Sequence, residues 1–151
     1  MPETAVPDAI ERQIDIAATP ERVYALVARP GWWINEGAIT DNVVATEGDV
    51  STVTHAKYGT YRVRTVDADP PRYVAFRWLG GDPANEGKEV PGTLVEFFVT
   101  ANAAGGVTLR VVESGFSTLP GTDEQRRKNH ADNSSGWEQE LEAARAHVEA
   151  G

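Results

Sequence analysis

TDEQRRKNHADNSSGWEQELEAARAHVE, residues Thr122 to Glu149, contains no proline and predicts one long C-terminal helix. Thr122 and Gln125 have the spacing of a capping box, which marks a helix start. Steps of three and four residues then define one stripe along this helix: His130, Ser134, Trp137, Leu141, Ala144 and Val148. The apolar C-terminal half of the stripe should pack on a sheet, whereas its polar N-terminal half should face polar groups or a cavity.

The middle of the chain alternates apolar and polar residues, which predicts an antiparallel sheet. Apolar side chains fall on one face of most strands and arginines on the other, as in a sheet that is covered on one side only. For the 93–101 strand the pattern does not show which face is buried, because both of its alternating sets of side chains are apolar. With turn residues as boundaries, we expect strands at 10–16, 42–46, 50–58, 60–67, 73–79, 93–101 and 106–114.

Short elements complete the predicted domain. Thr19-Pro20-Glu21 favours a helix start, because Thr can cap, Pro suits the first helical position and Glu complements the helix dipole. This helix should end before Pro30-Gly31, and a short helical turn should follow at 32–34. Residues 1–9 are expected to be a flexible arm, so that 10–151 form a single domain. The Gly- and Pro-rich connection 80–92 is long enough to be mobile or to act as a lid.

Composition and charge exclude several classes of function. The chain has 151 residues, no cysteine and a formal net charge of -9. An acidic surface repels phosphate backbones, so we expect no nucleic-acid partner. No apolar run is long enough to span a bilayer, and MPETAVPDAIE has no secretory-signal pattern. Together with the lack of disulfides, this favours a cytoplasmic protein.

The three histidines do not indicate a metal site. His55, His130 and His147 are dispersed and form no His-x-x-x-His or Glu-x-x-His pattern. The face of His55 within its strand is not determined by the pattern, and a helix-dipole contact suffices to explain His147. The Gly-Gly pairs have neither the spacing nor the following helix of a phosphate-binding loop, and no Gly-x-Ser-x-Gly motif is present. We therefore expect neither a metal nor another cofactor.

Several segments resemble the SRPBCC, or START-like, superfamily, and in particular its AHSA-type branch, which is named for a domain of the heat-shock-protein-90 ATPase activator. The similar segments are TPERVYALVARPGWW (19–33), YRVRTVDADPPRYVAFRW (61–78), GTLVEFFV (92–99), GGVTLRVVESGFSTLP (105–120) and NSSGWEQELEAARAHVE (133–149). The resemblance implies an α+β helix-grip fold. In that fold a curved antiparallel sheet wraps around the long C-terminal helix, and two short helices lie near the N-terminus.

The same resemblance implies an internal pocket between the sheet and the long helix. The candidates for ligand binding are Trp32, Trp33, Tyr61, Phe76, Trp78, Glu113, Phe116, His130, Asn133 and Trp137. The aromatic residues among them have an alternative role, which is simply to fill the core. Two observations favour a cavity: the resemblance implies one, and the inner stripe of the helix is polar.

Glu113 falls in register with Leu109 and Val111, so its carboxylate should point inward. A buried carboxylate must be paired, hydrogen-bonded or protonated. Its partner could be His130, Arg126 or the backbone N–H groups that follow it at 114–116. One interpretation is structural, a tie between the last strand and the long helix. The other makes Glu113 and His130 a polar anchor or an acid–base pair in the pocket.

These observations lead to one functional hypothesis and two alternatives. We expect a protein, monomeric or homodimeric, that binds a small hydrophobic or amphipathic molecule such as a lipid or a polyketide. The first alternative is a polyketide cyclase- or dehydratase-like enzyme. The second is a module that contacts a chaperone, with a role in stress response, as the name of the branch suggests.

Overall fold

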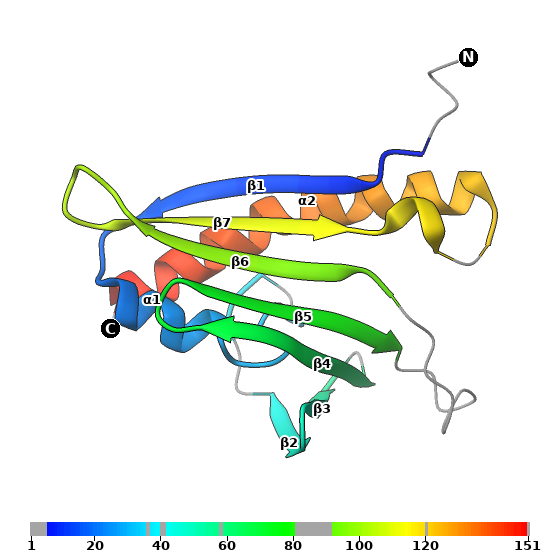
Figure 1. The fold of residues 1–151 in the computed structure, drawn as a ribbon, viewed down its shortest axis with the longest axis horizontal. Coiled ribbons are helices and arrows are strands. Elements are labelled where there is room, and N and C mark those ends of the chain that lie inside the picture. Colours follow the sequence, from blue (N-terminus) through cyan, green and yellow to red (C-terminus); the bar gives the residue numbers. More distant parts are fainter. Residues whose placement is uncertain are drawn as a thin grey trace.

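The computed structural model describes residues 6–35, 37–39, 42–57, 59–80, 92–119 and 121–150. Within them, seven strands form one antiparallel sheet in the order β1-β7-β6-β5-β4-β3-β2 (Figure 1). They are β1 (Ala9–Ile16), β2 (Val43–Glu47), β3 (Val50–His55), β4 (Gly59–Asp69), β5 (Tyr73–Gly80), β6 (Leu94–Ala101) and β7 (Val107–Ser114). All seven predicted strands are present, and their ends differ by a few residues at most.

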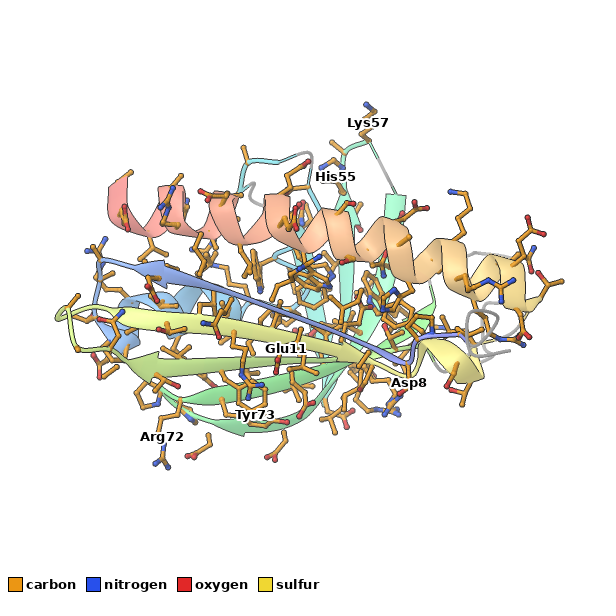
Figure 2. The ribbon with its side chains drawn as sticks, turned by 90° about the horizontal axis from the view of Figure 1, so that it is seen from above. Asp8, Glu11, His55, Lys57, Arg72 and Tyr73 are labelled. Carbon is orange, nitrogen blue, oxygen red and sulfur yellow. The ribbon has the colours of Figure 1, made fainter. Side chains whose placement is uncertain are left out.

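One long helix covers one face of the sheet. α2 (Asp123–Ala150) runs across the strands, and the sheet curves around it, so that β3 rises beside the helix (Figure 2). Tyr73 and Arg72 lie on the opposite side of the sheet, away from α2 (Figure 2). The buried part of the α2 stripe is Trp137, Leu141, Ala144 and Val148, all at most 4% exposed. The predicted helix-grip architecture is confirmed.

The short N-terminal helix is present as predicted, and residues 31–33 after it form a turn. In α1 (Pro20–Val27) the Thr19 hydroxyl caps the first turn by accepting a hydrogen bond from the Arg22 N–H at 3.3 Å. The helix ends at Ala28, and residues 28–33 form turns. The helical turn predicted at 32–34 is found as a single hydrogen-bonded turn, in which the Ile34 N–H donates to the Gly31 carbonyl oxygen at 2.9 Å. Pro30 and Gly31, which has a φ of +70°, prevent the helix from continuing.

The structure shows which face of β6 is buried, a question that the sequence pattern did not decide. Val95, Phe97 and Val99 of β6 are buried, whereas Leu94 and Phe98 are half-buried on the other face. The guanidinium of Arg110 lies 4.3 Å from the centre of the Phe98 ring, which shields that ring on the outer face. Polar packing on the outer face thus allows β6 to be apolar on both sides.

The last two residues of the predicted N-terminal arm, Asp8 and Ala9, are hydrogen-bonded to the rest of the domain. Ala9 already belongs to β1 and pairs with Ser114. The Asp8 carbonyl oxygen accepts hydrogen bonds from the N–H groups of Gly115 and Phe116, and its carboxylate accepts one from the Ser117 hydroxyl at 2.5 Å. The bonds that the carboxylate accepts, from the Ser117 hydroxyl and N–H and from the Gly115 N–H, lower the pKa of Asp8. Residues 1–5, and residues 81–91 of the predicted lid, lie outside the described residues.

The start of α2 allows a simple stability test. The Gln125 N–H donates to the Thr122 hydroxyl at 3.1 Å, and the Thr122 N–H donates to the Gln125 side chain at 2.9 Å, which completes the predicted capping box. Thr122→Ala removes one of these two bonds and should lower the free energy of unfolding by about 1 kcal/mol in urea titrations. Thr122→Ser serves as the matched control, because it keeps the capping hydroxyl. Equal effects of the two variants would contradict the prediction.

Candidate functional site

Aromatic side chains build the centre of the core between the sheet and α2. Trp32 and Trp33 stand at the turn after α1, and their rings pack around Phe97, with ring centres 5.4 and 5.6 Å from it. Trp137 of α2 closes the cluster at 5.7 Å from Phe97. Phe76 is fully buried beside Trp33. Trp32 and Phe76, both predicted to bind ligand, are therefore core residues that do not reach the pocket described next.

A pocket of about 180 Å³ lies beside this cluster, between the sheet and α2. We call it the Trp–Glu pocket. Its lining consists of Trp33, Trp78, Glu113, Asp132, Asn133, Gly136, Trp137 and Glu140. Each structural layer contributes to it: the turn after α1, two strands of the sheet, and one side of α2. Five of the ten predicted site residues are in this lining, which places them around one hollow.

Glu113 is the most completely bonded residue of the pocket. Its side chain is 1% exposed and projects inward from β7, as its register predicts. The Trp137 Nε1–H donates to Oε1 at 2.8 Å, and the Thr93 hydroxyl donates to Oε2 at 2.5 Å. The Asn133 amide contacts both oxygens at 3.2 and 3.3 Å. Burial raises the pKa of Glu113, and these hydrogen bonds oppose the shift.

None of the three partners predicted for Glu113 forms a hydrogen bond with it. The His130 ring bonds the Ala9 carbonyl oxygen through Nε2 at 2.9 Å and acts on Glu113 only through its charge. Arg126 donates to the Leu119 carbonyl oxygen and to Asp123. The N–H groups at 115 and 116 are used by Asp8. The donors are instead Asn133 and Trp137, which are one turn apart on α2, and Thr93, which precedes β6.

Glu140 is a pocket residue that the sequence reasoning missed. It is only 7% exposed, and burial raises its pKa to about 7, while a hydrogen bond from Asn35 opposes that shift. The predicted stripe followed His130, Ser134 and Trp137, but the pocket faces the adjacent line of the helix. Asn133, Gly136 and Glu140 follow one another at steps of three and four. That spacing relative to Trp137 is the signal that would have found Glu140.

Two buried polar atoms of pocket residues have no hydrogen-bond partner among the described residues. One is Oε1 of Glu140 and the other is Nε1 of Trp33, which is 9% exposed. Burying a polar group without a partner costs free energy, and in native proteins most such groups are paired. The pocket thus combines one satisfied carboxylate with an acceptor and a donor that are not satisfied within the described chain.

The remaining predicted site residues lie away from the pocket. The half-buried Tyr61 packs its ring against Trp78 at 5.7 Å, behind the pocket wall. Phe116 is fully buried and contacts the His130 ring edge-on at 5.2 Å. His130 and Ser134 face β1, where the Ser134 hydroxyl accepts from Arg12 at 2.7 Å. The polar half of the predicted stripe therefore meets the polar edge strand, and Glu113 and His130 do not form an acid–base pair in the pocket.

His55 lies on the buried face of β3 with Ser51 and Val53, and its side chain is 8% exposed. It stands at the end of the strand beside Lys57 (Figure 2), whose N–H donates to Nδ1 at 3.0 Å. This position is outside the Trp–Glu pocket.

A second, larger hollow is less suited to a specific ligand. It measures about 570 Å³ and is lined by parts of α1, the β4–β5 turn, β5 and β6. Its charged lining residues, Glu21 and Arg72, are exposed, and Arg72 is paired with Asp69 at 2.7 Å. No orphaned buried polar atom belongs to the described residues of its lining. The Trp–Glu pocket is therefore the better candidate.

The described part of the chain contains neither a metal site nor a membrane-spanning helix. Across the residues that the structure describes, no three His, Cys, Asp or Glu side chains are grouped so as to hold a metal ion. Over the same ranges, no helix has the length and apolar character needed to cross a membrane.

Comparison with known proteins identifies the fold. No family model and no curated protein matches the chain. Among solved structures, the aromatase/cyclase Zhui from a Streptomyces strain matches with a TM-score of 0.68 and 18% identity over 93% of each chain. The Aha1 dimer of Colwellia psychrerythraea matches with a TM-score of 0.63 and 20% identity over 93% of this chain and 96% of the other. A protein of the dynemicin biosynthetic locus matches with a TM-score of 0.66 and 19% identity over 95% of this chain, which spans 48% of that protein.

The structural neighbours include both an Aha1 protein and an aromatase/cyclase, at coverage above nine-tenths of this chain. The part of this chain that the structure describes has an antiparallel sheet curved around a long C-terminal helix. The chain therefore has the helix-grip fold that its sequence predicts, and at 18 and 20% identity the likeness to these structures extends to the fold alone.

Proposed function

We propose that this protein binds a small amphipathic molecule in the Trp–Glu pocket. The observation that carries the proposal is a hollow with tryptophan walls that also contains a buried carboxylate without a full set of partners, Glu140. Ligand pockets are typically lined by aromatic groups, with a few polar groups that fix orientation. The likenesses to Zhui and Aha1 support a fold that suits such a pocket, and they do not identify its ligand.

The size of the pocket limits the ligand. An apolar protein cavity of about 150 Å³ accepts a molecule of the size of benzene. The Trp–Glu pocket, at about 180 Å³, therefore suits one substituted ring or a similarly compact group. This favours a compact ligand over a long acyl chain.

Gly136 provides the test of location. It lines the pocket from α2, and a Cβ added there would meet nothing within 4 Å. Gly136→Phe should therefore fill the pocket without disturbing the fold, whereas Gly136→Ala should keep it open and stabilise the helix by about 0.5–1 kcal/mol. We expect hydroxylated single-ring compounds to shift the melting temperature and quench the tryptophan fluorescence of the wild type and of Gly136→Ala, but not of Gly136→Phe. Equal responses in all three proteins would place binding elsewhere, and no response in any would contradict the proposal.

A second candidate function is catalysis in the same pocket. The pKa of Glu140, at about 7, suits a group that exchanges protons near neutral pH, and Glu113 lies in the same lining. A cyclase- or dehydratase-like reaction needs such a proton carrier beside an aromatic wall. If turnover of a polyketide-like substrate is found, Glu140→Gln should reduce kcat at least a hundredfold. Unchanged kcat in that variant would exclude Glu140 as the proton carrier.

Cytoplasmic location, the choice between monomer and homodimer, and contact with a chaperone stay predictions. The acidic chain, with a net charge of -9, suits a basic partner surface. A pull-down at low salt that recovers no chaperone ATPase would argue against the chaperone contact.

A further inference from the structure

Building on the proposed function, we infer that the Trp–Glu pocket selects an organic cation, a protonated amine attached to a single aromatic ring. Neither the fold nor the comparisons specify the charge of the ligand, but the pocket does. It rests on the composition of the lining, on the unsatisfied buried carboxylate and on the arrangement of the tryptophan rings.

The lining carries charge of one sign only. Glu113 and Glu140 contribute two buried carboxyl groups, the exposed Asp132 is paired with Lys128 at 2.7 Å, and no Lys, Arg or His belongs to the described lining. The His130 ring bonds the Ala9 carbonyl oxygen and does not line the pocket. The whole chain is acidic as well, with a net charge of -9. The resulting potential attracts cations to the pocket and repels anions.

The two buried carboxylates have different roles. Glu113 already accepts hydrogen bonds from Thr93, Asn133 and Trp137, so it needs no further donor. Glu140 is also buried, at 7% exposed, and Asn35 donates one hydrogen bond to its carboxylate, but its Oε1 has no partner among the described residues. An ammonium group bordering Glu140 would supply both the missing donor and the compensating charge, and charge-assisted hydrogen bonds are the stronger kind.

The rings supply a second attraction to the same kind of group. Trp33, Trp78 and Trp137 all line the pocket. Trp33 meets Trp78 edge-on with ring centres 5.7 Å apart, and Trp137 lies 5.9 Å from Trp33. Tryptophan is the side chain whose face attracts cations most strongly, and aromatic walls combined with carboxylates are a general way to bind ammonium groups. An anionic head group would be repelled by both, and a neutral hydroxyl could donate to Glu140 but would gain neither the charge-assisted bond nor the attraction of the ring faces.

Three probes of matched size test the charge directly: phenethylamine, phenethyl alcohol and hydrocinnamate. Calorimetric titrations at about pH 8, where Glu140 is ionised because its pKa is about 7, should show phenethylamine binding at least about tenfold more tightly than the alcohol. Hydrocinnamate should not bind measurably. Glu140→Gln should weaken phenethylamine about tenfold and change the alcohol less than about twofold. Glu142→Gln removes an exposed charge from another face of α2 and is the matched control.

A second measurement is the number of protons that Glu140 releases when the amine binds. At pH 7 about half of the Glu140 side chains carry a proton, and an ammonium group that contacts Glu140 should displace it. Titrations of phenethylamine in buffers of different ionisation enthalpy should therefore show proton release that is absent with the alcohol and absent in Glu140→Gln.

The outcomes separate this inference from the proposed function. If the alcohol or hydrocinnamate binds as tightly as the amine, or if Glu140→Gln leaves amine binding unchanged, the cation inference is wrong. The proposed small-molecule pocket then stands, provided that Gly136→Phe abolishes the binding. Amine binding that survives Gly136→Phe would also overturn the inference, because it would occur elsewhere. If none of the three probes binds the wild type, both ideas fail.

Discussion

Glu140→Gln is expected to raise the free energy of unfolding by about 2–3 kcal/mol at about pH 8, and by much less at about pH 4. Burial raises the pKa of Glu140 from 4.5 to about 7, so the folded protein holds an ionised carboxylate there at a cost. Each pKa unit corresponds to about 1.4 kcal/mol, which makes the full effect about 3 kcal/mol. Glutamine resembles the neutral acid and avoids most of that cost. Urea unfolding of the two proteins at both pH values measures the difference.

The sign of the pH dependence follows from the two states. Below pH 4.5 the carboxyl group is protonated in both the folded and the unfolded chain, so Glu140 costs nothing. Between pH 4.5 and about 7 the unfolded chain releases the proton first, and the stability of the wild type falls as the pH rises. Above about pH 7 the loss is complete and stays constant. Glu113, whose pKa burial also raises, adds a trend of the same sign in both proteins.

The control for this prediction is an exposed glutamate on the same helix. Glu142→Gln should change the stability by no more than about 0.5 kcal/mol at either pH, because its salt bridge to Arg145 is on the surface. A stability difference between wild type and Glu140→Gln that is the same at both pH values would contradict the burial argument. A pocket that gives up stability to keep a charged group inside is a common arrangement in binding sites, because the group is retained for its ligand.

The fold could be predicted from the sequence because its signals are local and repeated. The capping box at Thr122, the Thr19-Pro20 helix start and the two-residue alternation of the strands all act within a few residues. The face of β6 could not be predicted in this way, since both of its faces are apolar. It depends on Arg110 of the neighbouring strand, which covers Phe98 from outside.

The site was only partly predictable, because it depends on the rotation of α2 about its own axis. Periodicity identifies the apolar stripe around Trp137 but does not show which polar neighbours lie beside the pocket and which lie beside β1. His130 and Ser134 face β1, whereas Asn133 and Glu140 face the pocket. These two pairs lie on adjacent lines of the same helix, so a small error in the assumed rotation of α2 exchanges them. The inward direction of Glu113 was predictable from strand register, whereas its partners came from elements distant in the chain.

Glu113→Leu is expected to lower the free energy of unfolding by about 3 kcal/mol. The substitution leaves the Trp137 N–H and the Thr93 hydroxyl without their acceptor, and both residues are only 4% exposed. A buried donor without a partner costs about 1–3 kcal/mol, whereas the exposed Asn133 can turn to water. Relief of the buried carboxylate, whose pKa burial raises, offsets part of this cost.

A second substitution separates the structural role of Glu113 from simple packing. In the wild type, Thr93→Val removes a donor from the carboxylate and should cost about 1–2 kcal/mol. In the Glu113→Leu background the same change removes an orphaned hydroxyl, so it should restore about 1 kcal/mol. This reversal of sign would establish Glu113 as the tie that joins β7 to the start of β6 and to α2. If Thr93→Val is equally costly in both backgrounds, the hydroxyl acts independently of the carboxylate and the tie does not exist.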